Sequence, residues 1–85
     1  MKITLRYFAS VREALGTGQE AFDLPEGVVT VGAVREALVA RGGSWAEMLG
    51  QGRAVRMACN QVMCGPEQPV TDGAEVAFCP PVTGG

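Results

Sequence analysis

The sequence contains no histidine. Histidine is the commonest general base near neutral pH and a frequent zinc ligand, so a self-contained catalytic site is hard to build from these residues. The chain also lacks a concentration of positive charge, because its 7 basic and 9 acidic residues give a net charge of −2. Nucleic-acid binding requires clustered Lys and Arg side chains. We therefore expect a protein that is not an enzyme by itself and that does not bind nucleic acid.

Long apolar runs are absent as well. No run approaches the roughly 20 residues of a membrane span, and Arg6 and Arg12 lie where a signal peptide would need its apolar centre. We expect a cytoplasmic protein that does not associate with membranes. An odd number of cysteines, 3, fits a reducing compartment. Cys59 and Cys64 have the spacing that opens a plant-type ferredoxin motif, but four thiolates cannot be assembled. We interpret both as packed thiols and predict no metal site.

A chain of 85 residues, 47% of them hydrophobic, is long enough for one small domain with its own core. Alternation of apolar and polar residues predicts strands over residues 2–9, 19–24, 54–59, 62–64 and 75–79. Thr30 is a predicted N-cap for the main helix, whose apolar positions Val31, Val34, Ala37 and Leu38 recur at helical spacing and predict one apolar stripe. The order of elements predicts an α+β fold in which one main helix packs on one face of a mixed sheet.

Two short helices and one tight turn complete this pattern. Ser10 and Ser44 are each followed three residues later by glutamate, the spacing of a capping box, which predicts helices up to Leu15 and Leu49. Asn60 and Gln61 separate two predicted strands, and asparagine tolerates positive φ in such turns. This turn would place Met57 opposite Cys64. Trp45 is expected to close one end of the core.

The last 11 residues, from Glu75 to Gly85, are the most distinctive part of the chain. In the predicted strand, Val76 and Phe78 share one face, while Ala77 and Cys79 share the other. Pro80 and Pro81 lack N–H donors and fix φ near −65°, so they end the strand and lead into an extended course. We predict a domain over residues 1–79 and an extended tail over residues 80–85.

The tail ends in Gly84 and Gly85, which have no side chains to pack and maximise backbone freedom. One interpretation is a frayed chain end, as is common at termini. The other is a segment that passes through a channel too narrow for Cβ atoms, so that another protein reaches the terminal carboxylate. We favour the second interpretation because a strand leads directly into the two prolines and then into the two glycines.

These residues resemble a known family. Residues 72–78, followed by Pro-Pro-Val-Thr-Gly-Gly at 80–85, resemble the C-terminal signature of the MoaD-like sulfur carriers, the small subunits of molybdopterin synthase; residues 3–9 and 55–61 also resemble this family. The resemblance implies a ubiquitin-like β-grasp fold in which the first and last strands lie parallel in the centre of the sheet. Cys79 departs from the family, whose members often carry a bulky apolar residue there.

The resemblance also implies a function. A partner enzyme would use ATP and Mg²⁺ to adenylate Gly85, and a sulfur donor would then convert the adenylate to a thiocarboxylate. The large, catalytic subunit of molybdopterin synthase would receive the tail, and the sulfur would attack cyclic pyranopterin monophosphate. The chain itself would bind no cofactor. Alternatives are a sulfur carrier for thiamin or tRNA thiolation, a ubiquitin-like protein modifier, and an interaction domain with an inert tail.

Docking requires a surface as well as a tail. The residues that we expect to contact partners are Met63, Phe78, Cys79, Pro80, Pro81, Val82 and Thr83, with Gly84 and Gly85 as the reactive end. For Phe78 the competing interpretation is a position in the core, because it shares a face with Val76. Arg6, Arg53 and Arg56 either form salt bridges at the rim of this surface or are only solvated.

Overall fold

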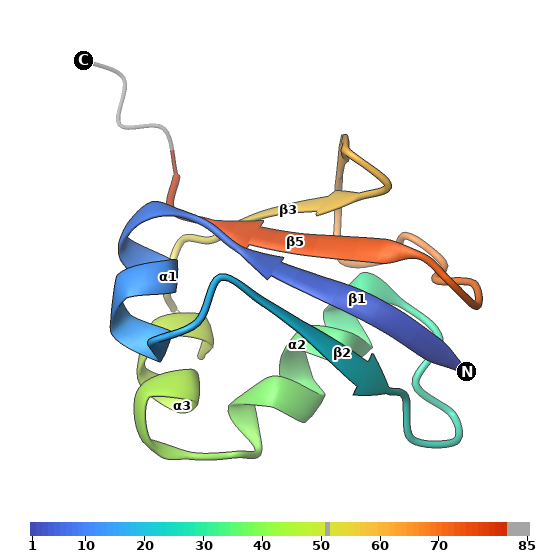
Figure 1. Ribbon diagram of the computed structural model, residues 1–85, viewed down its shortest axis with the longest axis horizontal. Helices are drawn as coiled ribbons and strands as arrows, with labels where there is room; N and C mark the ends of the chain where they lie inside the picture. Colours follow the sequence, from blue (N-terminus) through green and yellow to red (C-terminus); the bar gives the residue numbers. More distant parts are fainter. Residues whose placement is uncertain (51, 82–85) are drawn as a thin grey trace.

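The computed structural model describes residues 1–50 and 52–81. In these residues, one mixed sheet has the strand order β2-β1-β5-β3-β4. The strands are β1 (Lys2–Tyr7), β2 (Gln19–Asp23), β3 (Arg56–Cys59), β4 (Val62–Cys64) and β5 (Glu75–Cys79). The same residues form the helices α1 (Ala9–Leu15), α2 (Val31–Val39) and α3 (Gly43–Leu49). The helices α2 and α3 lie on one side of the sheet, and α1 lies at the end towards which β1 and β5 point (Figure 1).

Strand β5 lies in the middle of the sheet, although it is the last strand of the described chain. It pairs in parallel with β1, with Thr4 opposite Glu75 and Tyr7 opposite Phe78. On its other edge it pairs antiparallel with β3, where Arg56 lies opposite Cys79. The parallel, central pairing of the first and last strands is therefore confirmed. Because both edges of β5 are hydrogen-bonded, the segment that follows Cys79 leaves from a fixed point (Figure 1).

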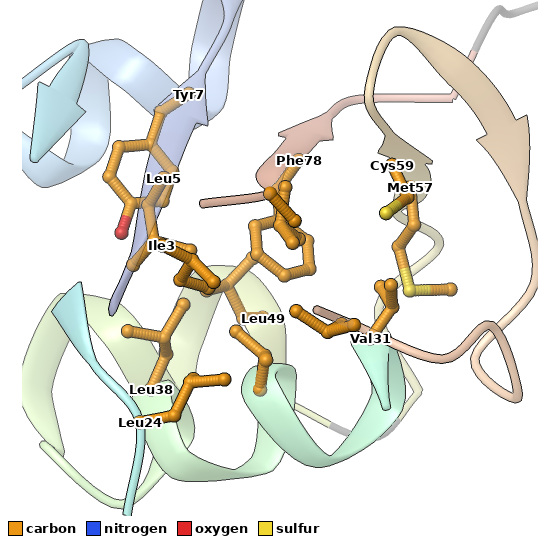
Figure 2. Close-up of a cluster of buried hydrophobic side chains, with 14 of the residues drawn as sticks. Ile3, Leu5, Tyr7, Leu24, Val31, Leu38, Leu49, Met57, Cys59 and Phe78 are labelled. Carbon is orange, nitrogen blue, oxygen red and sulfur yellow. The ribbon is translucent and has the colours of Figure 1, made fainter. Parts of the chain in front are cut away.

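The core fills the space between the sheet and the helices. Strand residues on the helix-facing side are buried, and they pack against apolar side chains of α1, α2 and α3. Figure 2 shows side chains from both layers pointing toward one another. The largest side chains with less than 2% exposure are Tyr7, Phe78, Ile3, Leu5, Leu38, Leu49, Val11, Val31, Val34 and Val76. Val31, Val34 and Leu38 of the predicted apolar stripe are thus confirmed as core, whereas Ala37 is only partly buried.

Several local predictions are confirmed. The Thr30 side chain accepts a hydrogen bond of 3.1 Å from the Ala33 N–H, so it caps α2 as expected. Asn60 and Gln61 have φ values of 51° and 67°, and they form the turn between β3 and β4. Both central residues therefore have the positive φ that two-residue hairpins favour, because it matches the twist of the strands. The register places Met57 opposite Cys64.

Both predicted capping boxes are wrong. Helix α1 begins at Ala9 and α3 begins at Gly43, so Ser10 and Ser44 are already helical, and neither N-cap residue has a side-chain cap hydrogen bond. For α1 the reason is the sheet. The Phe8 N–H donates to the carbonyl oxygen of Phe78, and Ala9, with φ of 51°, turns the chain abruptly into the helix. The first strand therefore ends at Tyr7 instead of Ala9. Separately, β3 starts at Arg56 instead of the predicted Ala54.

An aromatic and charged cluster closes one end of the core, where Trp45 was expected. The buried Tyr7 hydroxyl donates to Glu20 at 2.8 Å, and Arg41 forms an ion pair with the same carboxylate at 2.8 Å. The Arg41 guanidinium lies 4.4 Å from the ring centroid of Trp45 and 5.2 Å from that of Phe22. Burial, followed by the hydrogen bond to Glu20, raises the pKa of Tyr7 far above its ordinary value. The hydroxyl therefore stays protonated and can keep donating.

Candidate partner-docking site at the end of strand β5

The predicted tail begins where the structure places the end of β5. Cys79 is the last strand residue; Pro80 is half-buried and Pro81 is exposed, and neither belongs to a strand or helix. Proline cannot donate to a ladder and fixes φ, which explains why pairing stops here. The predicted contact residues Val82 and Thr83 and the predicted reactive residues Gly84 and Gly85 lie outside the described residues.

The two faces of β5 have different roles. Val76 and Phe78 point into the core and are 0% exposed, whereas Ala77 and Cys79 lie on the opposite face and are partly exposed. The predicted division of the strand into two faces is confirmed. The expectation that Phe78 contacts a partner is therefore wrong for its side chain, which is already surrounded by the protein's own core. A partner that lies along β5 meets Ala77 and Cys79 instead.

A hollow of about 310 Å³ lies on this second face, which none of the described helices covers. We call it the sheet-face hollow. Its residues come from β1, β3, β4, β5 and the connections between them: Arg6, Phe8, Ala58, Gln61, Met63, Glu75, Ala77 and Cys79. Ala58 on β3 and Ala77 on β5 contribute small side chains to this lining. The fold thus brings Met63 and Cys79, which are 16 residues apart in the sequence, into one surface beside the root of the tail.

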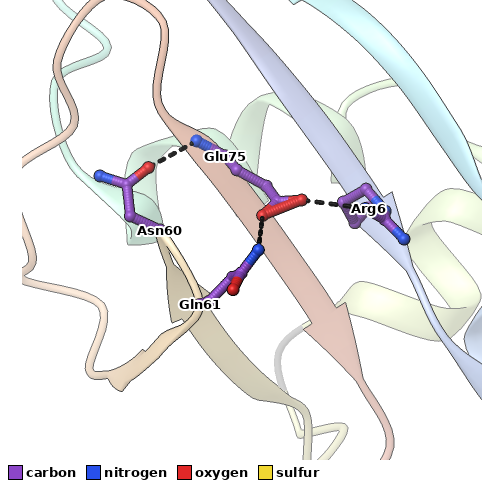
Figure 3. A network of polar contacts seen from close by, with 4 residues as sticks. All are labelled: Arg6, Asn60, Gln61 and Glu75. Carbon is purple, nitrogen blue, oxygen red and sulfur yellow. Dashed lines mark hydrogen bonds and ion pairs between the residues drawn. The ribbon is translucent and has the colours of Figure 1, made fainter.

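Three polar side chains that line the sheet-face hollow, those of Arg6, Gln61 and Glu75, belong to the hydrogen-bonded network shown in Figure 3. The Glu75 carboxylate accepts from Arg6 at 3.1 Å and from Gln61 at 3.5 Å, while the Glu75 N–H donates to the Asn60 side chain at 3.0 Å. The Arg6 guanidinium also lies 5.4 Å from the ring centroid of Phe8. Of the two alternatives considered for Arg6, the salt bridge at the rim is therefore the one observed, and its partner is Glu75 of the same chain.

Phe8 is a candidate contact residue that sequence reasoning did not identify. Its ring lines the hollow and is 42% exposed, and Met63 is 50% exposed. The signal was present in the alternation of the first strand, where an aromatic residue shares the face of Thr4 and Arg6. An aromatic side chain on an otherwise polar face is a common mark of a protein interface. Cys79 contributes a thiol whose sulfur lies 3.7 Å from the Arg56 carbonyl oxygen.

The other two cysteines belong to the core and not to this surface. Cys59 is buried on β3, Cys64 is partly buried on β4, and all three cysteines are free thiols. Burial, with smaller effects from Cys59 and Glu67, raises the pKa of the Cys64 thiol. The interpretation of Cys59 and Cys64 as packed thiols is confirmed. Among the described residues, no group of three His, Cys, Asp or Glu side chains is placed to hold a metal ion.

Comparisons with known proteins identify the family. The model of the ThiS family matches residues 5–85. The chain belongs to this family. Two relatives of this chain are named molybdopterin synthase sulfur carrier subunits. The one from Escherichia coli is 42% identical to this chain, and the one from Haemophilus influenzae is 40% identical. Each match covers 98% of this chain and 99% of the relative. The family resemblance seen in the sequence is therefore confirmed.

Solved structures show the same fold. SAMP1 from Haloferax volcanii is 26% identical, with a TM-score of 0.78 and coverage of 100% of both chains. The HVO 2177 protein from the same organism is 29% identical, with a TM-score of 0.82 and coverage of 100% of this chain and 87% of the other. This ThiS-family chain thus has the ubiquitin-like β-grasp fold that the sequence predicted. None of the described helices is long and apolar enough to cross a bilayer.

Proposed function

We propose that this chain is the sulfur-carrier subunit of a molybdopterin synthase. The observation that carries the proposal is similarity over nearly the full length to two such subunits, at 40–42% identity. In addition, the Pro-Pro-Val-Thr-Gly-Gly segment follows directly after the central strand β5 in the sequence. The chain would be the non-catalytic sulfur donor of a two-subunit sulfurtransferase. We further propose that it works in the cytoplasm, where its free thiols stay reduced.

The proposed chemistry begins with activation of Gly85. A carboxylate is a poor electrophile because its negative charge repels nucleophiles and oxide is a poor leaving group. An adenylating partner enzyme that binds ATP and Mg²⁺ would let the Gly85 carboxylate attack the α-phosphorus, with pyrophosphate leaving. Hydrosulfide (HS⁻) released by a sulfur donor would then attack the acyl carbon, AMP would leave, and the S–H proton would be lost to solvent. The product is a C-terminal thiocarboxylate, which is ionised at neutral pH and is a soft nucleophile.

Transfer would take place on the large subunit, which supplies the catalytic groups. The thiocarboxylate sulfur would attack a carbon of cyclic pyranopterin monophosphate and displace an oxygen substituent, and water would then cleave the resulting thioester, which leaves the sulfur on the pterin and returns the Gly85 carboxylate. Two such deliveries would complete the dithiolene of molybdopterin. Gly84 would let the tail pass a narrow channel, and Val82 and Thr83 would contact its walls. Pro80 and Pro81 restrict the chain before it docks, which lowers the entropy cost of binding.

The sheet-face hollow supports a docking role for the domain. It is continuous with the root of the tail through Cys79, and it exposes Phe8 and Met63 beside small residues. Exposed apolar side chains grouped beside polar ones are typical of protein interfaces. We propose that partners bind this face while they hold the tail, with Met63, Cys79 and Phe8 as contacts.

A protein-modifier function is the second candidate, and a specific observation favours it. The structural relative from Haloferax volcanii is described as small archaeal modifier protein 1. The adenylation step would be the same, but a lysine amine would displace AMP and form an isopeptide. A carrier for thiamin or tRNA thiolation would share the thiocarboxylate and differ only in the sulfur acceptor.

Intact mass of the chain purified from its native cell separates these functions. A sulfur carrier is expected to show a fraction in which one oxygen is replaced by sulfur at the C-terminus, and incubation with the large subunit and cyclic pyranopterin monophosphate should discharge it. A chain without Gly85 is the matched control, and it should remain folded but unloaded. Isopeptide adducts without thiocarboxylate would instead support the modifier, and full sulfur transfer by the control chain would refute both.

A further inference from the structure

A second hollow, distinct from the sheet-face hollow, lies beside the root of the tail. It has a volume of about 320 Å³, and it is lined by α1, α3, residues 52–55 and the first residues of the tail. We call it the tail-root hollow. Its apolar lining consists of Val11, Met48, Ala54, Val55, Pro80 and Pro81. Since Cys79 lines the first hollow and Pro80 the second, hollows adjoin both sides of the point where the tail leaves the sheet.

One wall of the tail-root hollow is held in place by Arg35 of α2. Its guanidinium donates to the carbonyl oxygens of Leu49 at 2.6 Å, Gly50 at 3.1 Å and Arg53 at 2.9 Å. These bonds tie the end of α3 and the following segment to the main helix. A wall that is already ordered loses little conformational entropy when a ligand binds, which is the property of a preformed site.

The hollow also carries a positive charge that no described residue neutralises. The side chain of Arg53 lines it, and within residues 1–50 and 52–81 the one hydrogen-bond contact of this side chain is with the Met48 sulfur, at 3.6 Å. No carboxylate lies within ion-pair distance of Arg53 in the described residues. A thioether sulfur is a weak acceptor and leaves the guanidinium charge available. A carboxylate supplied from outside would therefore complement this surface.

We propose that the tail-root hollow is a second contact for the large synthase subunit, which inserts an apolar side chain flanked by a carboxylate that pairs with Arg53. The inference rests on the proposed function, because a partner that accepts the tail must pass Pro80 and Pro81, and both line this hollow. Contacts on both sides of the tail fix its direction. A single contact on the sheet face would leave the domain free to tilt about the tail.

Two substitutions test this proposal in the full chain. Arg53→Glu reverses the charge, and Ala54→Arg fills the hollow from an exposed position, so neither disturbs the core. Lys2→Glu is the matched charge reversal, since Lys2 lies on β1 at the end of the sheet remote from the tail. Calorimetric titration with the large subunit is expected to show binding at least about tenfold weaker for Arg53→Glu and Ala54→Arg, and a change within about twofold for Lys2→Glu.

Salt dependence supplies a second readout. A pair between Arg53 and a partner carboxylate is weakened by screening, so wild-type affinity should fall more steeply with ionic strength than that of Arg53→Glu. Met63→Asp, in the sheet-face hollow, separates this proposal from the proposed function. The tail-root contact is overturned, and the carrier function stands, if Met63→Asp weakens binding of the large subunit while Arg53→Glu and Ala54→Arg bind it like the wild type. The same conclusion follows if Arg53→Glu and Ala54→Arg weaken only the binding of the adenylating enzyme. If the wild type binds no large subunit, both are overturned.

Discussion

Truncation of Phe78 to alanine tests the division of β5 into a core face and a docking face. The Phe78 side chain is 0% exposed, and its ring stacks against Tyr7 with the centroids 6.4 Å apart. Removal of a fully buried phenylalanine typically costs about 3–5 kcal/mol, because it loses transfer free energy and leaves a cavity. A domain of this length has a total free energy of unfolding of roughly 4–13 kcal/mol. Phe78→Ala is thus expected to remove a large share of the stability.

Met63→Ala is the matched substitution on the other face. Met63 is 50% exposed in the free protein, so its truncation should cost about 1 kcal/mol or less. For binding of the large subunit we expect the opposite ranking of the two substitutions. Met63→Ala should weaken binding, whereas Phe78→Ala should not, provided that binding is measured at a temperature where this variant is folded. Urea unfolding followed by circular dichroism gives both stabilities, and an unchanged slope would show that the denatured state is comparable.

Two results would refute this reasoning. A cost below about 1.5 kcal/mol for Phe78→Ala would mean that the side chain does not fill the centre of the core. Equal costs for Phe78→Ala and Met63→Ala would mean that the two faces of the sheet are not differentiated in the way that their exposure indicates. Thermal unfolding provides an independent check, because a loss of 3 kcal/mol corresponds to a fall in Tm of roughly 12–24 °C for a domain of this size.

Three further predictions follow from local structure. Thr30→Ala should cost about 1 kcal/mol, since the Ala33 N–H loses its 3.1 Å acceptor, while Thr30→Ser should retain most of the stability in thermal unfolding. Gly32→Ala would place a Cβ 2.8 Å from the Cβ of Pro66 and 3.0 Å from its carbonyl oxygen, so a loss of about 1–3 kcal/mol is expected, and an unchanged Tm would contradict this contact. Tyr7→Phe should cost about 1 kcal/mol near neutral pH through loss of the bond to Glu20. In the unfolded chain Tyr7 ionises near the ordinary tyrosine pKa of about 10, whereas burial raises its pKa in the fold. The stability of the wild type should therefore decline as the pH rises above about 10, and this decline should be shallower in Tyr7→Phe.

The parts of the fold that follow from short-range pattern were predictable. Alternation alone assigns Phe78 and Cys79 to opposite faces, because side chains in a strand alternate whatever the strand pairs with. The turn at Asn60 and Gln61 fixed the register of β3 and β4 for the same local reason. The parallel pairing of β5 with β1 was not predictable in this way, since the pairing of Thr4 with Glu75 joins residues 71 positions apart. Only the family resemblance indicated it.

Helix starts and surface hollows depend on contacts that no local pattern contains. The capping box at Ser10 fails because the backbone of Phe8 is still bonded to Phe78 and the helix starts at the next residue. The exposed ring of Phe8 comes to lie over the sheet for the same reason. The tail-root hollow combines Val11, Arg53 and Pro80 from three separate segments. The sequence pattern gives no basis for bringing these three residues together.

The position of β5 also determines how the domain responds to a pull on its end. Tension applied beyond Pro80 along the strand axis loads the hydrogen bonds to β1 and to β3 in shear, so many must yield together, whereas bonds at a peeled edge yield one after another. If the tail is drawn into other proteins and withdrawn, as the proposed function requires, the domain is mechanically anchored at the strand that bears this load.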